Sequence, residues 1–185
     1  PCETFSHGEV EDYTVNIVAA QPQYCASQGE SQAFEYISRV QLNTIDNSSG
    51  PSPYSDFTAM STDLTIGISN TITITPEWIG YEAQEGYAVW IDYNQDNDFD
   101  YLEERVWYQG YGWAPPVGSF TVPPSALTGN TRMRVSMKFG NPYPCETFSH
   151  GEVEDYTVNI VAAPPPSPCD FVINTDCGVT NNFSL

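Results

Sequence analysis

Residues 131–139 read TRMRVSMKF, and apolar and polar side chains alternate along this stretch. Successive side chains of a β-strand point to opposite faces, so a period of two directs one set of side chains into a core and the other set outward. The stretch therefore predicts a strand with one buried face. The expected inward residues are Thr131, Met133, Val135, Met137 and Phe139.

The same period predicts further strands on both sides of this segment. Residues 87–91, YAVWI, are almost continuously apolar and indicate a central strand. One helical turn is expected at 123–127, and no segment has a stronger helical period. We expect an all-β fold, an antiparallel β-sandwich of the immunoglobulin-like or jelly-roll-like kind with about seven or eight strands. The other expected inward residues are Phe34, Tyr36, Val40, Leu42, Leu64, Ile66, Ile68, Ile72, Ile74, Tyr156, Val158 and Ile160.

The chain also contains a long internal identity. Residues 1–20 and 144–163 both read PCETFSHGEVEDYTVNIVAA. An identity of this length indicates a tandem array of one unit. The expected divisions are 1–20 as the closing strand of a preceding unit, 21–23 as a linker, 24–163 as a complete sandwich, 164–168 as a proline-rich semi-rigid linker, and 169–185 as the start of a following module.

The negative net charge of the chain limits the classes of partner that can be expected. Lys and Arg together number 5 against 24 Asp and Glu, which gives a net charge of −19. Nucleic acid is excluded as an expected partner because phosphate binding needs cationic side chains. No apolar run is long enough to predict membrane insertion. Copies of so acidic a chain repel one another unless cations neutralise them.

The chain has five cysteines, and whether they form disulfides indicates the compartment in which the protein is found. Cys25 opens the complete unit and Cys145 lies near its close, so we expect a disulfide between them, worth about 4–5 kcal/mol by loop-closure entropy. Cys169 and Cys177 are expected to pair locally, and Cys2 would have its partner in the preceding unit. Free buried thiols are the alternative. Disulfides favour an extracellular location.

The loop that follows the central strand carries the densest set of oxygen ligands. Residues 92–100 read DYNQDNDFD, with side-chain oxygens at every second position. Ca²⁺ takes six to eight oxygen ligands, and a residue at loop position twelve, here Glu103, closes such a shell. Asn97 stands where a glycine is usual, and asparagine tolerates left-handed backbone angles. A solvated acidic turn is the alternative to a Ca²⁺ site. The candidate ligands are Asp92, Asn94, Asp96, Asp98, Asp100, Glu103 and Glu104.

A second acidic cluster lies at the start of the last strand, where residues 151–156 read GEVEDY. Two interpretations stay open. The carboxylates form a second metal site or add ligands to the first, or they lie on a strand edge where they deter aggregation or pair with Arg132 and Arg134. The residues concerned are Asp56, Glu152, Glu154 and Asp155.

These motifs together resemble the GEVED domain. The resemblance rests on the GEVEDYTV strand, the WIDYNQDNDFD loop, the TRMRVSMKF strand and the cysteines near both ends of residues 24–163. It implies a β-sandwich module of secreted or cell-surface bacterial proteins that has no catalytic activity of its own. By position, Asp92, Asn94, Asp96 and Asp98 match the acidic loop of the family, whereas residues 169–185 lie outside the resemblance.

The sequence matches none of the common catalytic motifs, and we expect no enzymatic activity. His7 and His150 are the same repeat position, and no metalloprotease, nucleophile-elbow or phosphate-loop motif occurs. The aromatic residues Trp107, Tyr111 and Trp113 either cap the core, contact a neighbouring subunit or stack on sugar rings. Asn47 and Asn182 begin N-glycosylation sequons.

The expected function is structural. The unit would be a Ca²⁺-stabilised repeat of an extracellular bacterial filament or surface adhesin. Its partners would be neighbouring copies, joined by adding the closing strand of residues 1–20 to a neighbour's sheet. Tyr13, Val15 and Ile17 would make that subunit contact. The alternative is a carbohydrate-binding accessory module of a secreted enzyme.

Overall fold

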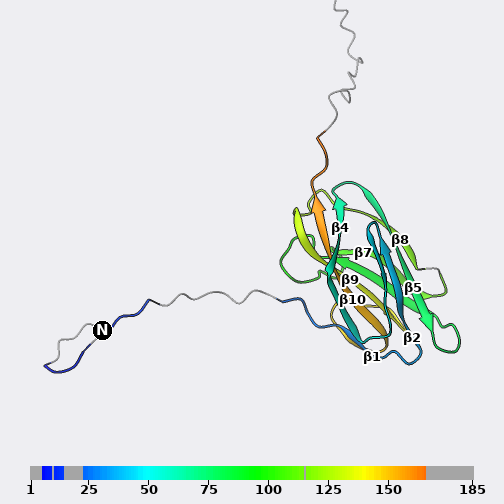
Figure 1. Ribbon diagram of the computed structural model, residues 1–185, viewed down its shortest axis with the longest axis horizontal. Coiled ribbons are helices and arrows are strands. Elements are labelled where there is room, and N and C mark those ends of the chain that lie inside the picture. Colours follow the sequence, from blue (N-terminus) through cyan, green and yellow to red (C-terminus); the bar gives the residue numbers. More distant parts are fainter. Residues whose placement is uncertain (1–5, 10, 15–22, 115, 166–185) are drawn as a thin grey trace, which may run out of the picture.

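The computed structural model describes residues 6–9, 11–14, 23–114 and 116–165, and within these ranges it contains ten strands and no helix. The strands form two sheets packed face to face, which confirms the all-β sandwich (Figure 1). The strands are β1 (Gln28–Ser31), β2 (Glu35–Leu42), β3 (Ile45–Ser48), β4 (Tyr54–Thr65), β5 (Ser69–Trp78), β6 (Glu85–Ile91), β7 (Arg105–Gly112), β8 (Val117–Thr121), β9 (Gly129–Lys138) and β10 (Thr147–Val161).

The topology is organised by β10, the longest strand at 15 residues. The larger sheet has the order β1-β10-β9-β6-β7, with β4 also paired to β10, and the smaller sheet has the order β3-β2-β5-β8. β10 is antiparallel to β9 but parallel to both β1 and β4. The expected antiparallel pairing therefore holds for most strand pairs but not for these two, and the sandwich has ten strands where about seven or eight were expected. β10 is long enough for two different strands to share its second edge.

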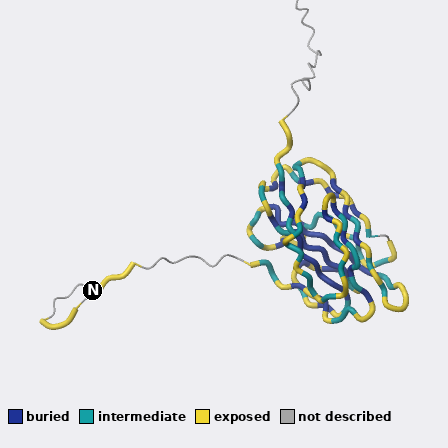
Figure 2. The backbone as a smooth tube through the Cα atoms, in the orientation of Figure 1, coloured by how far each residue is buried: buried dark blue, intermediate teal, exposed yellow. Residues whose placement is uncertain are grey.

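The core confirms most of the alternation seen in the sequence. Met133, Val135 and Met137 of β9 are fully buried, and every residue of the central strand β6 is buried. Phe139 was expected to be inward but is 55% exposed, because β9 ends at Lys138. Figure 2 shows the buried residues gathered along the strands between the two sheets.

The buried face of β2 differs from the expected one because the strand contains a β-bulge. The register between β2 and β5 shifts between Ile37 and Arg39. One extra residue reverses the side to which the preceding side chains point. Val40 is therefore inward as expected, but Ile37 and Glu35 are buried and Phe34 is exposed. Tyr36, also expected inward, is only partly buried, and Ile68 is exposed because β4 has already ended at Thr65.

The expected Cys25–Cys145 disulfide is confirmed, with the two Cα atoms 5.5 Å apart. It joins the segments that lead into the parallel strands β1 and β10 across a separation of 120 residues. The guanidinium of Arg134 binds the backbone oxygens of Cys25 and Pro144 at 2.8 and 2.7 Å, so both segments are also held against β9. Cys2, Cys169 and Cys177 lie outside the described residues.

The leading copy of the repeated sequence differs from the second copy. Residues 6–9 and 11–14 belong to no strand, and Tyr13 is 78% exposed, whereas the same residue types in β10 are paired and mostly buried. Val15 and Ile17 lie outside the described residues. No helix in the described ranges has the length and apolar character needed to cross a membrane.

Three strands approach one another closely around Gly151. This residue has a φ of 117°, and a Cβ added to it would lie 2.1 Å from the carbonyl oxygen of Met137. A Cβ added to Gly29 of β1 would lie 2.0 Å from the carbonyl oxygen of Gly151 itself. A larger residue at position 151 would therefore force β9 away from β10, and a larger residue at position 29 would force β1 away.

We predict that Gly151→Ala lowers the free energy of unfolding by about 3 kcal/mol or more, because it combines an unfavourable φ with a clash against backbone. Gly50→Ala is the matched control, since nothing lies within 4 Å of its added Cβ. The control should change stability by less than about 0.5 kcal/mol. Urea unfolding followed by tryptophan fluorescence measures both variants, and equal stabilities would contradict the close approach of β9 to β10 at Gly151.

Candidate metal centre and the buried acidic strand

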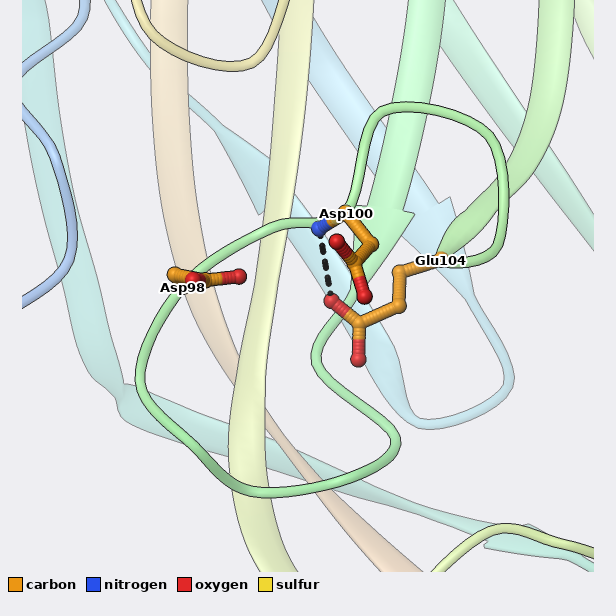
Figure 3. A group of neighbouring side chains, drawn as sticks. All are labelled: Asp98, Asp100 and Glu104. Carbon is orange, nitrogen blue, oxygen red and sulfur yellow. Dashed lines mark hydrogen bonds between the residues drawn. The ribbon is translucent and has the colours of Figure 1, made fainter.

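The acidic loop connects β6 to β7 and brings three carboxylates together. Oxygen atoms of Asp98, Asp100 and Glu104 all lie within 4.8 Å of one another (Figure 3). Asp98 and Asp100 are exposed, whereas Glu104 is 3% exposed. Among the described residues, this is the one group of three His, Cys, Asp or Glu side chains with that spacing. It is the place in this part of the chain where a cation would meet several carboxylates at once.

Glu104 holds the loop in its curled shape. Its Oε1 accepts hydrogen bonds from the backbone N–H groups of Tyr93 at 2.8 Å and Asn94 at 3.3 Å, and its Oε2 accepts one from the N–H of Asp100 at 3.0 Å. Burial raises the pKa of Glu104 to about 7 against these hydrogen bonds, which lower it. The sequence had placed Glu103 at the closing position of the loop. The structure brings Glu104 into the cluster instead, and Glu103 is exposed.

Local hydrogen bonds explain how the remaining loop residues lie. Asn94 and Asp96 each accept a bond from the backbone N–H two residues further on, at 3.0 and 3.1 Å. Asn97 has a φ of 69°, as its residue type led us to expect, and Gln95 has a φ of 56°, which the sequence did not reveal. Two left-handed residues turn the chain back on itself, so that alternate side chains converge.

Asp92 is the buried member of the loop. Its Oδ2 accepts hydrogen bonds from the Tyr24 hydroxyl at 2.6 Å and from the N–H of Asn97 at 3.1 Å. Its Oδ1 is buried and has no hydrogen-bond partner among the described residues. A buried carboxylate oxygen without a partner is costly, and a bound cation is one way to satisfy it.

The electrostatics of the loop also favour a cation. Burial, followed by the charges of Asp96, Asp100 and Asp92, raises the pKa of Asp98. The carboxylates therefore disfavour one another's charged forms. A divalent cation would remove this repulsion, and the donors present are the oxygen atoms that Ca²⁺ and Mg²⁺ prefer.

The carboxylates of the GEVEDY segment have a different role, because β10 lies inside the sheet and not at its edge. Glu152 accepts hydrogen bonds from the backbone N–H of Ile37 at 3.2 Å, beside the bulge in β2, and from the Ser55 hydroxyl at 3.1 Å. Glu154 accepts bonds from the Ser49 hydroxyl at 2.7 Å and the Tyr156 hydroxyl at 2.6 Å. Bonds to Ile37 and Ser49 connect the larger sheet to the smaller one.

Asp155 points to the opposite face of β10. Arg134 donates two hydrogen bonds of 2.8 Å to its two oxygens, Tyr54 donates one of 3.0 Å, and Arg132 lies at 3.4 Å. Pairing with Arg132 and Arg134, one of the two interpretations left open by the sequence, is therefore what the structure contains. Asp56 is exposed and accepts hydrogen bonds from the N–H and hydroxyl of Thr58.

The candidate glycan-contact residues do not lie together as one platform. Trp107 packs against the core and over Gly118. A Cβ atom added to Gly118 would lie 2.1 Å from the indole nitrogen of Trp107. Tyr111 and Trp113 are 42% and 63% exposed near the end of β7. Asn47, in the first sequon, donates a hydrogen bond of 2.9 Å from its side-chain amide to the Tyr156 hydroxyl. Asn182 lies outside the described residues.

Comparison with protein families adds one finding. Residues 86–159 match the GEVED domain. The matched segment contains nearly all of β6, the acidic loop, β7 to β9 and most of β10, so the resemblance is confirmed over these residues. A search of curated proteins found no match. The family match therefore supports the acidic loop and the buried acidic strand as parts of one module.

Two buried carboxyls predict how stability depends on pH. Burial raises the pKa of Glu85 and of Glu152 to about 8, with the neighbouring charges of Glu35 and Glu154 adding to the respective shifts. A carboxyl whose pKa is higher in the folded state than in the unfolded chain favours folding while it is protonated. That stabilisation is lost as the pH rises through the folded pKa.

With divalent ions removed by a chelator, we therefore predict that the free energy of unfolding falls between pH 5 and pH 8, by about 1.4 kcal/mol per pH unit for each of the two carboxyls at most. Glu85→Gln should flatten this slope, because it keeps the shape of the side chain and removes the titration. Glu77→Gln, at an exposed position of β5, should leave the slope unchanged. Denaturant unfolding at five pH values measures the free energy of unfolding. A free energy that increases from pH 5 to pH 8 would contradict this account.

Proposed function

We propose that the protein is a structural module of an extracellular bacterial filament or surface adhesin, stabilised by Ca²⁺ bound at the acidic loop. The observation that carries the metal proposal is the buried, unpartnered Oδ1 of Asp92 in the same loop as the three carboxylates within 4.8 Å. Ca²⁺ suits this loop better than Mg²⁺, because it accepts irregular shells of six to eight oxygens.

The other buried acids support a structural role. Glu152, Glu154 and Asp155 make their hydrogen bonds within the chain, so they stabilise the sandwich and are not free for a second ion. The Cys25–Cys145 disulfide suits an oxidising compartment outside the cytoplasm. The module would thus resist unfolding by three separate means: a disulfide, buried acid contacts and a bound cation.

The exact repeat supports assembly with neighbouring copies. A strand with the sequence of residues 144–163 fits between β9 and β4 in the sandwich, and residues 1–20 carry the same sequence. Tyr13 corresponds to the buried Tyr156 but is itself 78% exposed. Adding this segment to the sheet of a neighbouring copy would bury it and would satisfy its backbone groups.

A carbohydrate-binding module is the second candidate. It is favoured by the exposure of Tyr111 and Trp113, since exposed aromatic rings can stack on sugars. Trp107 does not add to it, because its indole packs against Gly118. A glycan array separates the two functions, because a purely structural module should bind no glycan selectively.

The metal proposal predicts that Ca²⁺ raises the free energy of unfolding, by about 2.7 kcal/mol at one hundred times the dissociation constant. Asp98→Asn should remove most of this gain and yet stabilise the protein in chelator, because it relieves repulsion in the loop. Glu77→Gln removes the same charge at an exposed position and should keep the full response. Isothermal titration and thermal unfolding measure the effects; equal stability of the native chain in chelator and in Ca²⁺ would refute the proposal.

The assembly proposal predicts that the full chain forms end-to-end multimers in Ca²⁺ as its concentration rises. Removing residues 1–22 should leave a monomer with the same thermal stability, and Tyr13→Asp should weaken assembly by placing a charge in the new sheet. Light scattering coupled to size-exclusion chromatography measures the mass. A full chain that stays monomeric at every concentration would count against strand addition.

A further inference from the structure

An aromatic-walled cavity lies beside the start of β6, at the other end of that strand from the acidic loop. Its volume is about 240 Å³. Phe34, Ile79, Tyr81 and Phe139 form its apolar wall and are all more than half exposed, Tyr81 the most at 81%. So many large apolar side chains around one hollow are typical of a binding site.

The polar lining of this cavity contains a buried carboxyl oxygen without a hydrogen-bond partner among the described residues. Glu35 is 3% exposed, lines the cavity, and its Oε1 has no hydrogen-bond partner among the described residues. The bulge in β2 turns Glu35 inward, toward β6. Glu85 at the start of β6 is 1% exposed, and neither of its oxygens has a partner in the described part of the chain. Burial, followed by the charge of Glu35, raises the pKa of Glu85, and the nearby indole of Trp78 lowers it.

The chain has no Lys or Arg to spare for these two carboxyls. All five lie in described segments, and each is engaged elsewhere. His150, whose ring lies 5.2 Å from that of Phe34, also lines the cavity and is the nearby group that can carry a positive charge. Burial raises the pKa of Glu35, and the charge of His150 lowers it. The engaged cations are Arg39 with Asp46, Arg132 and Arg134 with Asp155, Lys138 with Glu146, and Arg105 over the rings of Tyr101 and Tyr108.

We propose that this cavity binds an organic ammonium group supplied from outside the chain. The Glu35 carboxylate would face the positive charge, and the rings of Tyr81 and Phe139 would attract it through cation–π interactions. A metal ion is disfavoured here, because hard cations need several oxygen ligands and the walls are aromatic. The volume is below that of pockets for drug-sized ligands, which suits one lysine side chain or one small amine.

The proposal is independent of the Ca²⁺ and assembly proposals, and it is tested on the full chain in chelator. The first probe is choline, compared with 3,3-dimethylbutanol, which has the same shape without the charge. NMR titration should show choline binding at least tenfold more tightly, with shifts at Tyr81 and Phe139. Equal affinities would show an apolar hollow with no preference for cations and would overturn the proposal.

Three variants assign the binding to this cavity. Glu35→Gln removes the charge while keeping the size of the side chain, and Tyr81→Ala removes an exposed wall; each should weaken choline binding at least tenfold. Glu77→Gln, an exposed acid on β5, should leave it unchanged. Native affinity in both cavity variants would overturn the assignment.

A second set of probes separates two sources of the ammonium group. The peptide Gly-Lys-Gly, acetylated at its N-terminus and amidated at its C-terminus, represents a lysine side chain from a partner protein, and its acetyl-lysine form is neutral. Tighter binding of Gly-Lys-Gly than of choline would identify a protein partner, whereas the reverse would identify a free amine. Failure of both charged probes to bind more tightly than their neutral forms would overturn the proposal.

Discussion

The burial of three acidic side chains in one strand constrains the whole molecule. Glu152, Glu154 and Asp155 are all fully buried, so each must find hydrogen-bond partners within the protein. Glu152 and Glu154 find theirs partly on the smaller sheet, and Asp155 finds its partner in Arg134. Removing one partner of a buried ion pair typically costs about 3–5 kcal/mol, so a shifted register of β10 would be strongly disfavoured. Glu152 and Glu154 thus hold the two sheets in alignment, and Asp155 holds β10 in register with β9.

Local sequence patterns were sufficient for the strands whose two faces differ clearly. The alternation in residues 131–137 and the apolar run in residues 87–91 predicted β9 and β6 correctly. Periodicity could not reveal the bulge in β2, because one extra residue leaves no mark in composition yet reverses Phe34 and Glu35. Nor could it reveal the parallel pairing of β10 with β1 and β4, which depends on contacts between distant segments.

The acidic residues show a similar division between what local sequence reveals and what it does not. Spacing alone identified the loop, but the choice between Glu103 and Glu104 depends on how β7 begins beside β6, where Ile91 donates a hydrogen bond to the Glu104 carbonyl at 3.0 Å. A run of carboxylates in sequence looks the same whether it binds a metal or bonds within the core. Only the positions of Ile37 in the opposite sheet and of Ser49 directly after its strand β3 distinguish the two for Glu152 and Glu154.

Native-state amide hydrogen exchange tests the central claim about β10 most directly. If the buried acids hold the two sheets together, the amides of residues 152–158 should exchange only through global unfolding, with the slowest rates in the protein. The edge strands β3 and β8 should open locally and exchange faster. Exchange in residues 152–158 as fast as in those edge strands, under conditions where the fold is intact, would contradict the account.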